Sequence, residues 1–370
     1  MREYLLAITL AATLCFLITP LVRIVALKSG AYINVRARDM HTHITPRWGG
    51  LAMWVSMSIT FLVVSHLPLV SKSFGREATG IFLAGTFIMI LGALDDLYDL
   101  DSITKFAGQA LAAGILLLHG VQILWLPING GIVTLPPNIG QLITVLFVMV
   151  VINAVNFVDG LDGLATGIVA ICASAFFGFS YLLAVINGFN RAGAPSLITA
   201  IVIGICIGFL PHNYHPARIF MGDSGAMFLG LLLSAAAITL TGQIDANSIT
   251  ENGTAPLLPL LLPFAVLAIP LLDLGMAIVR RLKAGRSPFA ADREHLHHRL
   301  IELGNSHRRT SLILYTWTAM FAVPTVVAAF YPLWSALLSG AVIFGISILL
   351  IRRSVIDTRE KNSEKREALV

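Results

Sequence analysis

Long apolar stretches separated by short polar segments run through almost the whole chain. A helix that crosses a membrane needs about 20 mainly apolar residues. Eleven segments approach that requirement: 4–22, 49–67, 79–94, 106–126, 139–157, 164–185, 195–212, 224–240, 257–279, 310–330 and 335–351. The pattern therefore predicts an all-α, polytopic membrane protein with about eleven transmembrane helices.

The composition supports this prediction. Hydrophobic residues make up 56% of the 370 residues and charged residues only 12%, whereas soluble domains contain about 25% charged residues. An ordinary soluble enzyme, a disordered chain and a nucleic-acid-binding protein are excluded as classes. The three cysteines, Cys15, Cys172 and Cys206, lie in apolar stretches without zinc-site spacing, so they form neither a disulfide framework nor a zinc site.

The distribution of basic residues predicts the orientation. If the N-terminus is outside, 21 of the 25 Lys and Arg residues fall in the inner segments, as the positive-inside rule requires. The C-terminus is then cytoplasmic. The strong positive flank follows the first apolar stretch, which favours a retained span over a cleaved signal peptide. Residues 352–370 are expected to form a charged cytoplasmic tail, partly helical or disordered.

Acidic residues gather on the same side. The first group contains Asp95, Asp96, Asp99 and Asp101, where the third span meets the cytoplasm. Carboxylates this close repel one another unless a cation is present. The adjacent pair Asp95 and Asp96 therefore indicates a bound cation or cationic partner, whereas Asp99 and Asp101 are compatible with an exposed helix end.

A second group combines amides and acids at three-residue intervals: Asn153, Asn156, Asp159 and Asp162. This spacing would align the side chains along one helical ridge. Oxygen-only ligands suit Mg²⁺ or Mn²⁺ and not zinc. A turn rich in Asx and glycine residues is the structural alternative.

Two further acids have open roles. Asp223 follows a glycine at the start of the span 224–240, where it could cap the helix or bind a metal. Asp273 lies within an apolar span, where buried acids are rare. It is expected either to pair with a basic neighbour or to support the site from behind.

Basic and histidine residues complete the inner face. The last inner loop contains Arg280, Arg281, His295, His297 and His298. Such residues suit a phosphate or pyrophosphate, although arginines also fix topology. Lys105, which could instead extend to the membrane surface, follows the acidic pair, and His41 lies in the first inner loop.

Together these features indicate an enzyme acting on a soluble nucleotide-activated compound and a lipid-borne phosphate. A metal would neutralise the pyrophosphate, and the apolar remainder would accommodate the lipid. A transporter is the rival class. Transporters place ionisable groups near the bilayer midplane, whereas these acids cluster at inner ends and loops, which favours the enzyme.

The chain resembles the polyprenyl-phosphate N-acetylhexosamine-1-phosphate transferase family, particularly its branch specific for N-acetylglucosamine. The matching segments span nearly every inner loop in order: His41 through Gly50, Gly92 through Asp96, Lys105-Phe106 with Gln109, Asn153 through Gly163, Phe220 through Gly225, Pro270 through Asp273, Arg280 through Phe289, and Asp292 through His298.

The resemblance implies a reaction and a set of roles. Undecaprenyl phosphate would attack the β-phosphorus of UDP-GlcNAc with Mg²⁺ or Mn²⁺, giving undecaprenyl-pyrophosphoryl-GlcNAc and UMP and initiating a cell-surface polysaccharide. Asp95 and Asp96 match the catalytic acids, and Asp223 and Asn156 the metal site. The matching substrate-binding residues are Lys105, Asp159, Asp162, Arg280, Arg281, His295, His297, His298 and His41.

The resemblance also implies the domain organisation and location. Residues 1–351 would form one catalytic transmembrane domain in the bacterial cytoplasmic (inner) membrane. The active site would lie on cytoplasmic loops 23–48, 95–105, 153–163, 213–225 and 280–309. Its partners would be UDP-GlcNAc, undecaprenyl phosphate and membrane lipid, with no nucleic acid. The sequence leaves open whether the chain acts alone or as a homodimer.

Two alternative sugar donors remain open. The sister branch, which uses UDP-MurNAc-pentapeptide, carries three consecutive histidines where Leu296 interrupts them here. Another UDP-N-acetylhexosamine would need only a few altered contacts. The reaction could also proceed by single displacement or through a covalent aspartyl-phosphate.

Overall fold

The apolar segments form helices, as predicted. The computed structural model describes residues 1–33, 45–68, 75–128, 131–186, 193–242, 258–285 and 295–367. The helices are α1 (Arg2–Ser29), α2 (Gly49–Val64), α3 (Arg76–Tyr98), α4 (Ser102–Leu118), α5 (Pro137–Val158), α6 (Leu164–Ile186), α7 (Gly193–Asn213), α8 (Gly222–Gly242), α10 (Leu258–Val266), α11 (Ala268–Lys283), α12 (Leu296–Glu302), α13 (His307–Phe330) and α14 (Leu333–Glu367).

Eight of these helices are long and apolar enough to cross a membrane: α1, α3, α5, α6, α7, α8, α13 and α14. The helices α2 and α4 are also apolar but shorter. The prediction of a helical, polytopic membrane protein is confirmed. The C-terminal tail continues α14 as far as Glu367, so it is helical over most of its length.

Two of the predicted spans have the wrong form. The segment 106–126 is not one helix, because α4 ends at Leu118 and Gly120 follows with φ +87°. Strand β3 (Trp125–Ile128) then pairs antiparallel with β4 (Gly131–Thr134). The segment 257–279 is divided between α10 and α11. Proline has no N–H, so Pro270 cannot continue the helical hydrogen bonding across this break.

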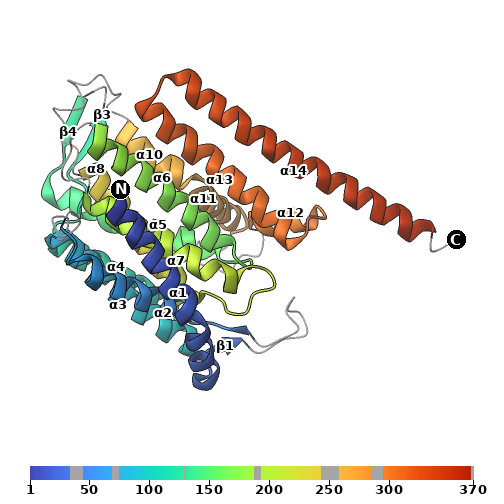
Figure 1. The fold of residues 1–370 in the computed structure, drawn as a ribbon, viewed down its shortest axis with the longest axis horizontal. Coiled ribbons are helices and arrows are strands. Elements are labelled where there is room, and N and C mark those ends of the chain that lie inside the picture. Colours follow the sequence, from blue (N-terminus) through green and yellow to red (C-terminus); the bar gives the residue numbers. More distant parts are fainter. Residues whose placement is uncertain are drawn as a thin grey trace.

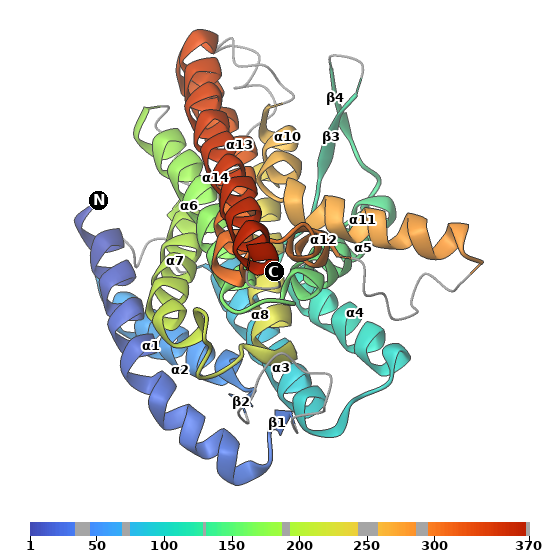
Figure 2. The same ribbon diagram turned by 90° about the vertical axis from the view of Figure 1, so that its right-hand side faces the viewer.

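Helix α8 forms the centre of the bundle and is buried along nearly its whole length. It packs against α2, α3, α5 and α7 (Figure 2). Glycines allow this close approach: a Cβ added at Gly50 or Gly92 would meet the backbone at Ser224, and one at Gly230 would meet the backbone of Ile152. The start of α8 is therefore held close to α2 and α3.

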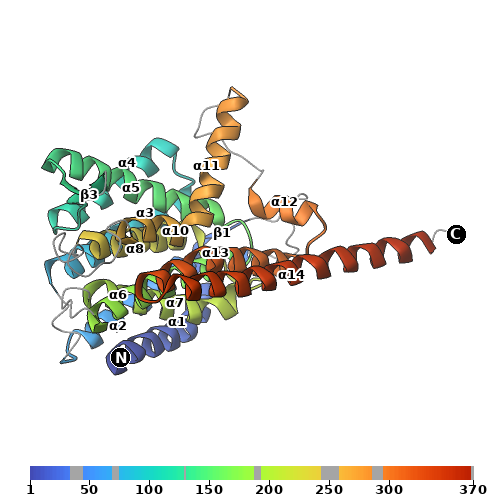
Figure 3. The same ribbon diagram turned by 90° about the horizontal axis from the view of Figure 1, so that it is seen from above.

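The hairpins and the last helices distinguish the two ends of the bundle (Figures 1 and 3). The hairpin β3–β4 lies at one end. The short antiparallel pair of β1 (Tyr32–Ile33) and β2 (Thr45–Pro46), together with α12, lies at the other. Helix α14 extends beyond the bundle at this second end, and α11 projects away from the remaining helices (Figure 3).

A pair of glycine substitutions tests the close contact between α3 and α8. In Gly92→Ala, the new methyl group would lie 2.5 Å from the Cα of Ser224, and such overpacking costs about 1–3 kcal/mol. We expect a lower melting temperature for the detergent-solubilised protein. The matched change Gly114→Ala in α4 meets nothing within 4 Å and should not lower it. Equal melting temperatures for the two variants would contradict this description of the contact.

Candidate active site

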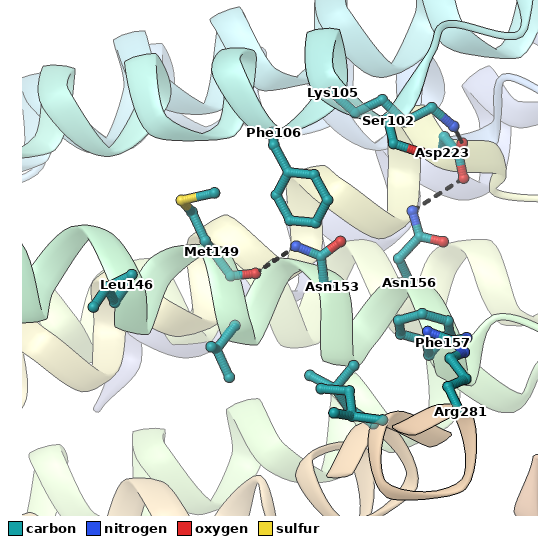
Figure 4. Close-up of a pocket in the computed structure, with 13 residues that line it drawn as sticks. Ser102, Lys105, Phe106, Leu146, Met149, Asn153, Asn156, Phe157, Asp223 and Arg281 are labelled. Atoms are coloured by element: carbon teal, nitrogen blue, oxygen red, sulfur yellow. Dashed lines mark hydrogen bonds and ion pairs between the residues drawn. The ribbon is translucent and has the colours of Figure 1, made fainter. Parts of the chain in front are cut away.

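A lysine joins two carboxylates where α3, α4, α5 and α8 meet. The Nζ atom of Lys105 lies 2.5 Å from Oδ2 of Asp95 and 3.0 Å from Oδ2 of Asp223. The amide nitrogen of Asn156 donates to the other oxygen of Asp223 at 3.1 Å (Figure 4). Four helices thus contribute one residue each to a compact polar cluster.

The turn between α3 and α4 positions the acid and the lysine. Asp99 ends α3 in the left-handed region with φ +49°, and the backbone N–H of Leu100 donates to Oδ1 of Asp95 at 2.8 Å. Asp101 begins α4 as its N-cap, and its hydrogen bonds, chiefly those from Thr104, lower its pKa. The interpretation of Asp99 and Asp101 as helix-end residues is confirmed.

The second acid of the pair has a different environment. Asp96 accepts hydrogen bonds from the backbone N–H groups of Asp223 at 2.9 Å and Ser224 at 3.2 Å, one on each carboxylate oxygen. Asp96 therefore caps α8 from the neighbouring helix α3. Asp223 does not serve as the cap, and its own carboxylate faces Lys105 and Asn156 instead.

The predicted ridge of amides and acids is correct only in its first half. Asn153 and Asn156 share the pocket face of α5, but the helix ends at Val158. The ridge prediction is wrong for Asp159 and Asp162, because the chain turns there. Asp162 is buried, and its Oδ2 accepts hydrogen bonds from His215 at 2.8 Å and from the backbone N–H of Ala217 at 3.0 Å.

Asp159 lies in the turn that follows α5. Burial, together with the neighbouring carboxylates of Asp223 and Asp96, raises the pKa of Asp159 to about 8, while Arg47 acts in the opposite direction. A raised carboxyl pKa means that the charged form is poorly compensated.

The predicted histidine segment packs against α11. Asp273 accepts hydrogen bonds from Nδ1 of His295 at 3.2 Å and from the backbone N–H of Leu296 at 3.0 Å, so its expected pairing with a basic neighbour is confirmed. Burial, with the nearby His298 and His295, lowers the pKa of His297 to about 3. His297 is therefore a neutral imidazole at neutral pH, not a cation.

The two arginines of α11 lie in different places. Arg281 is buried, and its guanidinium lies 5.1 Å from the centre of the Phe157 ring. Arg281 and Phe157 both line the pocket described below, whereas Arg280 is only partly buried and does not line it. The remaining predicted residue, His41, lies outside the described residues.

A pocket of about 480 Å³ connects the polar cluster to the apolar surfaces of three helices (Figure 4). Its polar end contains Lys105, Asn156, Asp223 and Arg281. Its other lining residues are mainly apolar: Phe106, Leu146, Met149, Val150, Phe157, Leu274 and Ile278, with Ser102 and Asn153. The pocket is suited to a molecule with an anionic head and a hydrocarbon chain.

The donor atoms at the polar end fit a hard divalent cation. Among the described residues, no three His, Cys, Asp or Glu side chains converge on one metal position. Asp223 offers a carboxylate and Asn156 an amide oxygen, provided its side-chain amide rotates. Mg²⁺ is commonly bound by one or two carboxylates together with water and substrate phosphates, so this sparse set of oxygen donors suits it.

Two residues of the site were not predicted. The ring of Phe157 packs against the guanidinium group of Arg281, and His215 forms a hydrogen bond with the carboxylate of Asp162. Phe157 could have been found from its position beside Asn156 within the polar motif. His215 lies in the predicted active-site loop 213–225, but its pairing with Asp162, 53 positions away, had no signal in the sequence.

The chain matches known proteins over most of its length. The sequence model of Glycosyl transferase family 4 matches residues 78–241, which include the polar cluster. The decaprenyl-phosphate N-acetylglucosaminephosphotransferase of Mycolicibacterium smegmatis is 42% identical over 360 residues, covering 95% of this chain and 89% of the relative. Its namesake from Mycobacterium tuberculosis is 41% identical over 365 residues, covering 95% and 90%.

A more distant relative has a related name. The undecaprenyl-phosphate alpha-N-acetylglucosaminyl 1-phosphate transferase of Escherichia coli is 28% identical over 349 residues, covering 90% of this chain and 86% of the relative. With these similarities, the chain belongs to the polyprenyl-phosphate N-acetylglucosamine-1-phosphate transferases of Glycosyl transferase family 4.

Proposed function

We propose that the protein transfers N-acetylglucosamine 1-phosphate from UDP-GlcNAc to a polyprenyl phosphate at the cytoplasmic face of a bacterial membrane. The observation that carries this proposal is the pocket, whose polar end, with Lys105, Asn156, Asp223 and Arg281, continues into an apolar wall. A lipid phosphate needs both environments at once. The names of the relatives supply the polyprenyl-phosphate acceptor and the sugar, and the UDP-linked donor is what the family resemblance implies.

The proposed membrane arrangement has eleven crossings. The eight long helices would be joined by α2, by α4, and by the pair α10 and α11 acting as one broken span. With the N-terminus outside, the basic segments and the polar cluster face the cytoplasm. Residues 1–351 then form one catalytic unit, followed by the cytoplasmic tail.

The proposal also specifies the prenyl chain length of the lipid acceptor. The relatives at 42% and 41% identity are named for decaprenyl phosphate, and the relative at 28% is named for undecaprenyl phosphate. We favour decaprenyl phosphate on this similarity. The pocket encloses the phosphate and the first part of a chain, so the rest of either chain would lie in the bilayer.

The proposed reaction is a single displacement. An oxygen of the lipid phosphate attacks the β-phosphorus of UDP-GlcNAc, the bond from that phosphorus to the bridging oxygen breaks, and UMP leaves. A phosphate monoester has a second pKa near 6, so the nucleophile is largely a dianion at neutral pH. Asp95 would orient the acceptor or take its remaining proton. The alternative is a covalent aspartyl-phosphate.

The other residues would bind the donor. Lys105 would contact the pyrophosphate, and Arg281 with the histidine segment would contact the sugar phosphate. Asp162 would act through His215, since both groups that approach its Oδ2 belong to the loop after α7. Asp223 and Asn156 would hold Mg²⁺ or Mn²⁺, whose charge would stabilise the anionic pyrophosphate.

A transfer assay tests the reaction. Purified protein with Mg²⁺ and decaprenyl or undecaprenyl phosphate should move radiolabel from UDP-GlcNAc into the lipid phase, and a chelator should stop the transfer. Parallel tubes contain UDP-MurNAc-pentapeptide. Lipid product only from the pentapeptide donor would assign the sister activity instead. No product from either donor would contradict the proposal.

Two substitutions test the division between metal binding and acceptor activation. Asp223→Asn removes a proposed metal ligand, so we expect its activity to need at least about tenfold more Mg²⁺. Asp95→Asn should lower the maximal rate by about 100-fold or more without a comparable shift in the Mg²⁺ requirement. Identical Mg²⁺ titration curves for the two variants would rule out this assignment.

The apolar wall can be tested with two leucines of α5. Leu146 lines the pocket and Leu142, one turn away, does not, although both are exposed. Leu146→Trp should raise the KM for decaprenyl phosphate about tenfold, equivalent to about 1.4 kcal/mol. Leu142→Trp is the matched control. If the two variants have the same KM for the acceptor, the lipid chain does not use this wall.

A further inference from the structure

We propose that Lys105 occupies the cation position of the site until a divalent metal displaces it, and that the displaced ammonium group then binds the diphosphate. This inference rests on the proposed metal site at Asp223 and Asn156. It adds a sequence of events: the metal binds first, and its binding creates the anion contact of Lys105.

The contacts around Lys105 carry the argument. Its ammonium group joins Asp95 at 2.5 Å and Asp223 at 3.0 Å. The second oxygen of each acid already accepts a hydrogen bond, from the backbone N–H of Leu100 and from the amide of Asn156. Rotation of the Asn156 amide would free Oδ1 of Asp223 for a metal. That metal would then share the carboxylate of Asp223 with the ammonium group of Lys105.

Lys105 is able to move away from such a metal. Its side chain is 30% exposed and lines the pocket, so it has a path into the substrate space. A lysine also has a long flexible stem and a compact charge. By contrast, the carboxylate of Asp96 accepts hydrogen bonds from two backbone N–H groups. It could not bind a metal in their place without opening the start of α8.

Electrostatic repulsion would drive Lys105 away from Asp223 once a metal binds. A divalent cation and an ammonium group repel each other when they share the same carboxylate, so metal binding weakens the hold on Lys105. The displaced amine remains tethered to α4 at the polar end of the pocket. It can then pair with phosphate oxygens at the place where the donor diphosphate has to lie.

Direct metal binding tests the exchange without any substrate. Mn²⁺ affinity would be measured by electron paramagnetic resonance for the wild type, Lys105→Met, Asp223→Asn and the control Lys28→Met. Methionine preserves length but offers no charge and no oxygen. Removing a competing cation should tighten Mn²⁺ binding about tenfold, within the usual range for coupled sites. Asp223→Asn should weaken it, and Lys28→Met should leave it unchanged.

Amine labelling follows Lys105 itself in the wild-type protein. With an acylating reagent and peptide mass spectrometry, labelling of Lys105 should be slow without metal and rise several-fold on addition of Mg²⁺. Lys28 and Lys283, both exposed, are the internal references and should not respond. Asp223→Asn should raise the labelling of Lys105 in the absence of metal, because only Asp95 then holds its ammonium group, and should abolish the response to Mg²⁺.

The outcomes separate the two proposals. If the wild type binds no Mn²⁺, or binds it as tightly as Asp223→Asn does, the proposed metal site fails and the exchange fails with it. If Asp223→Asn alone loses Mn²⁺ while Lys105→Met binds like the wild type, the metal site stands and the exchange is overturned. Unchanged labelling of Lys105 on addition of Mg²⁺ would also overturn the exchange, even if Lys105→Met does not fold.

Discussion

The hydrogen bonds between Asp96 and the start of α8 are the constraint on which the site depends. The first N–H groups of a helix have no partner within it, and a helix buried inside a membrane protein has little water to supply one. Asp96 provides both acceptors from α3. One of the two donors is the backbone N–H of Asp223 itself. The capping hydrogen bond therefore also fixes the position of the Asp223 backbone, from which its carboxylate extends.

The close approach of helices at this point has the same origin. Gly50 and Gly92 allow α2 and α3 to touch the backbone of α8 near Ser224. Helix α5 packs along another side of α8 and brings Asn156 to Asp223. The polar cluster is therefore set by backbone contacts between helices and not by flexible loops, which favours a fixed geometry for charge stabilisation.

Much of the fold could be predicted from hydrophobic periodicity, because a bilayer imposes the length of each apolar segment. The failures occurred where local backbone chemistry matters. Gly120 ends α4 early, and Pro270 divides a predicted span. The hydrophobic pattern did not predict the hairpin β3–β4. Its strands have only four residues each, whereas apolar segments are recognised over about 20 residues.

The site was predicted in composition but not in detail. The sequence indicated which acids share one face, yet the adjacent aspartates have different environments. Asp95 contacts a lysine, and Asp96 accepts hydrogen bonds from the backbone N–H groups of Asp223 and Ser224. Asp162 and Asp273 also hold loops or helix ends in place. Such differences depend on contacts between residues far apart in the chain, which one sequence does not reveal.

The direction of α11 has a consequence for how the substrates meet. This helix leaves the bundle next to α5 (Figure 3), and the pocket wall between them includes Leu146 and Val150, which are 53% and 42% exposed. In a bilayer these residues would face hydrocarbon tails. Under the proposed function, the lipid acceptor would then arrive by two-dimensional diffusion, and its effective concentration would be its density in the membrane. The nucleotide donor would arrive from bulk water, so the two substrates would reach the same cluster from different phases.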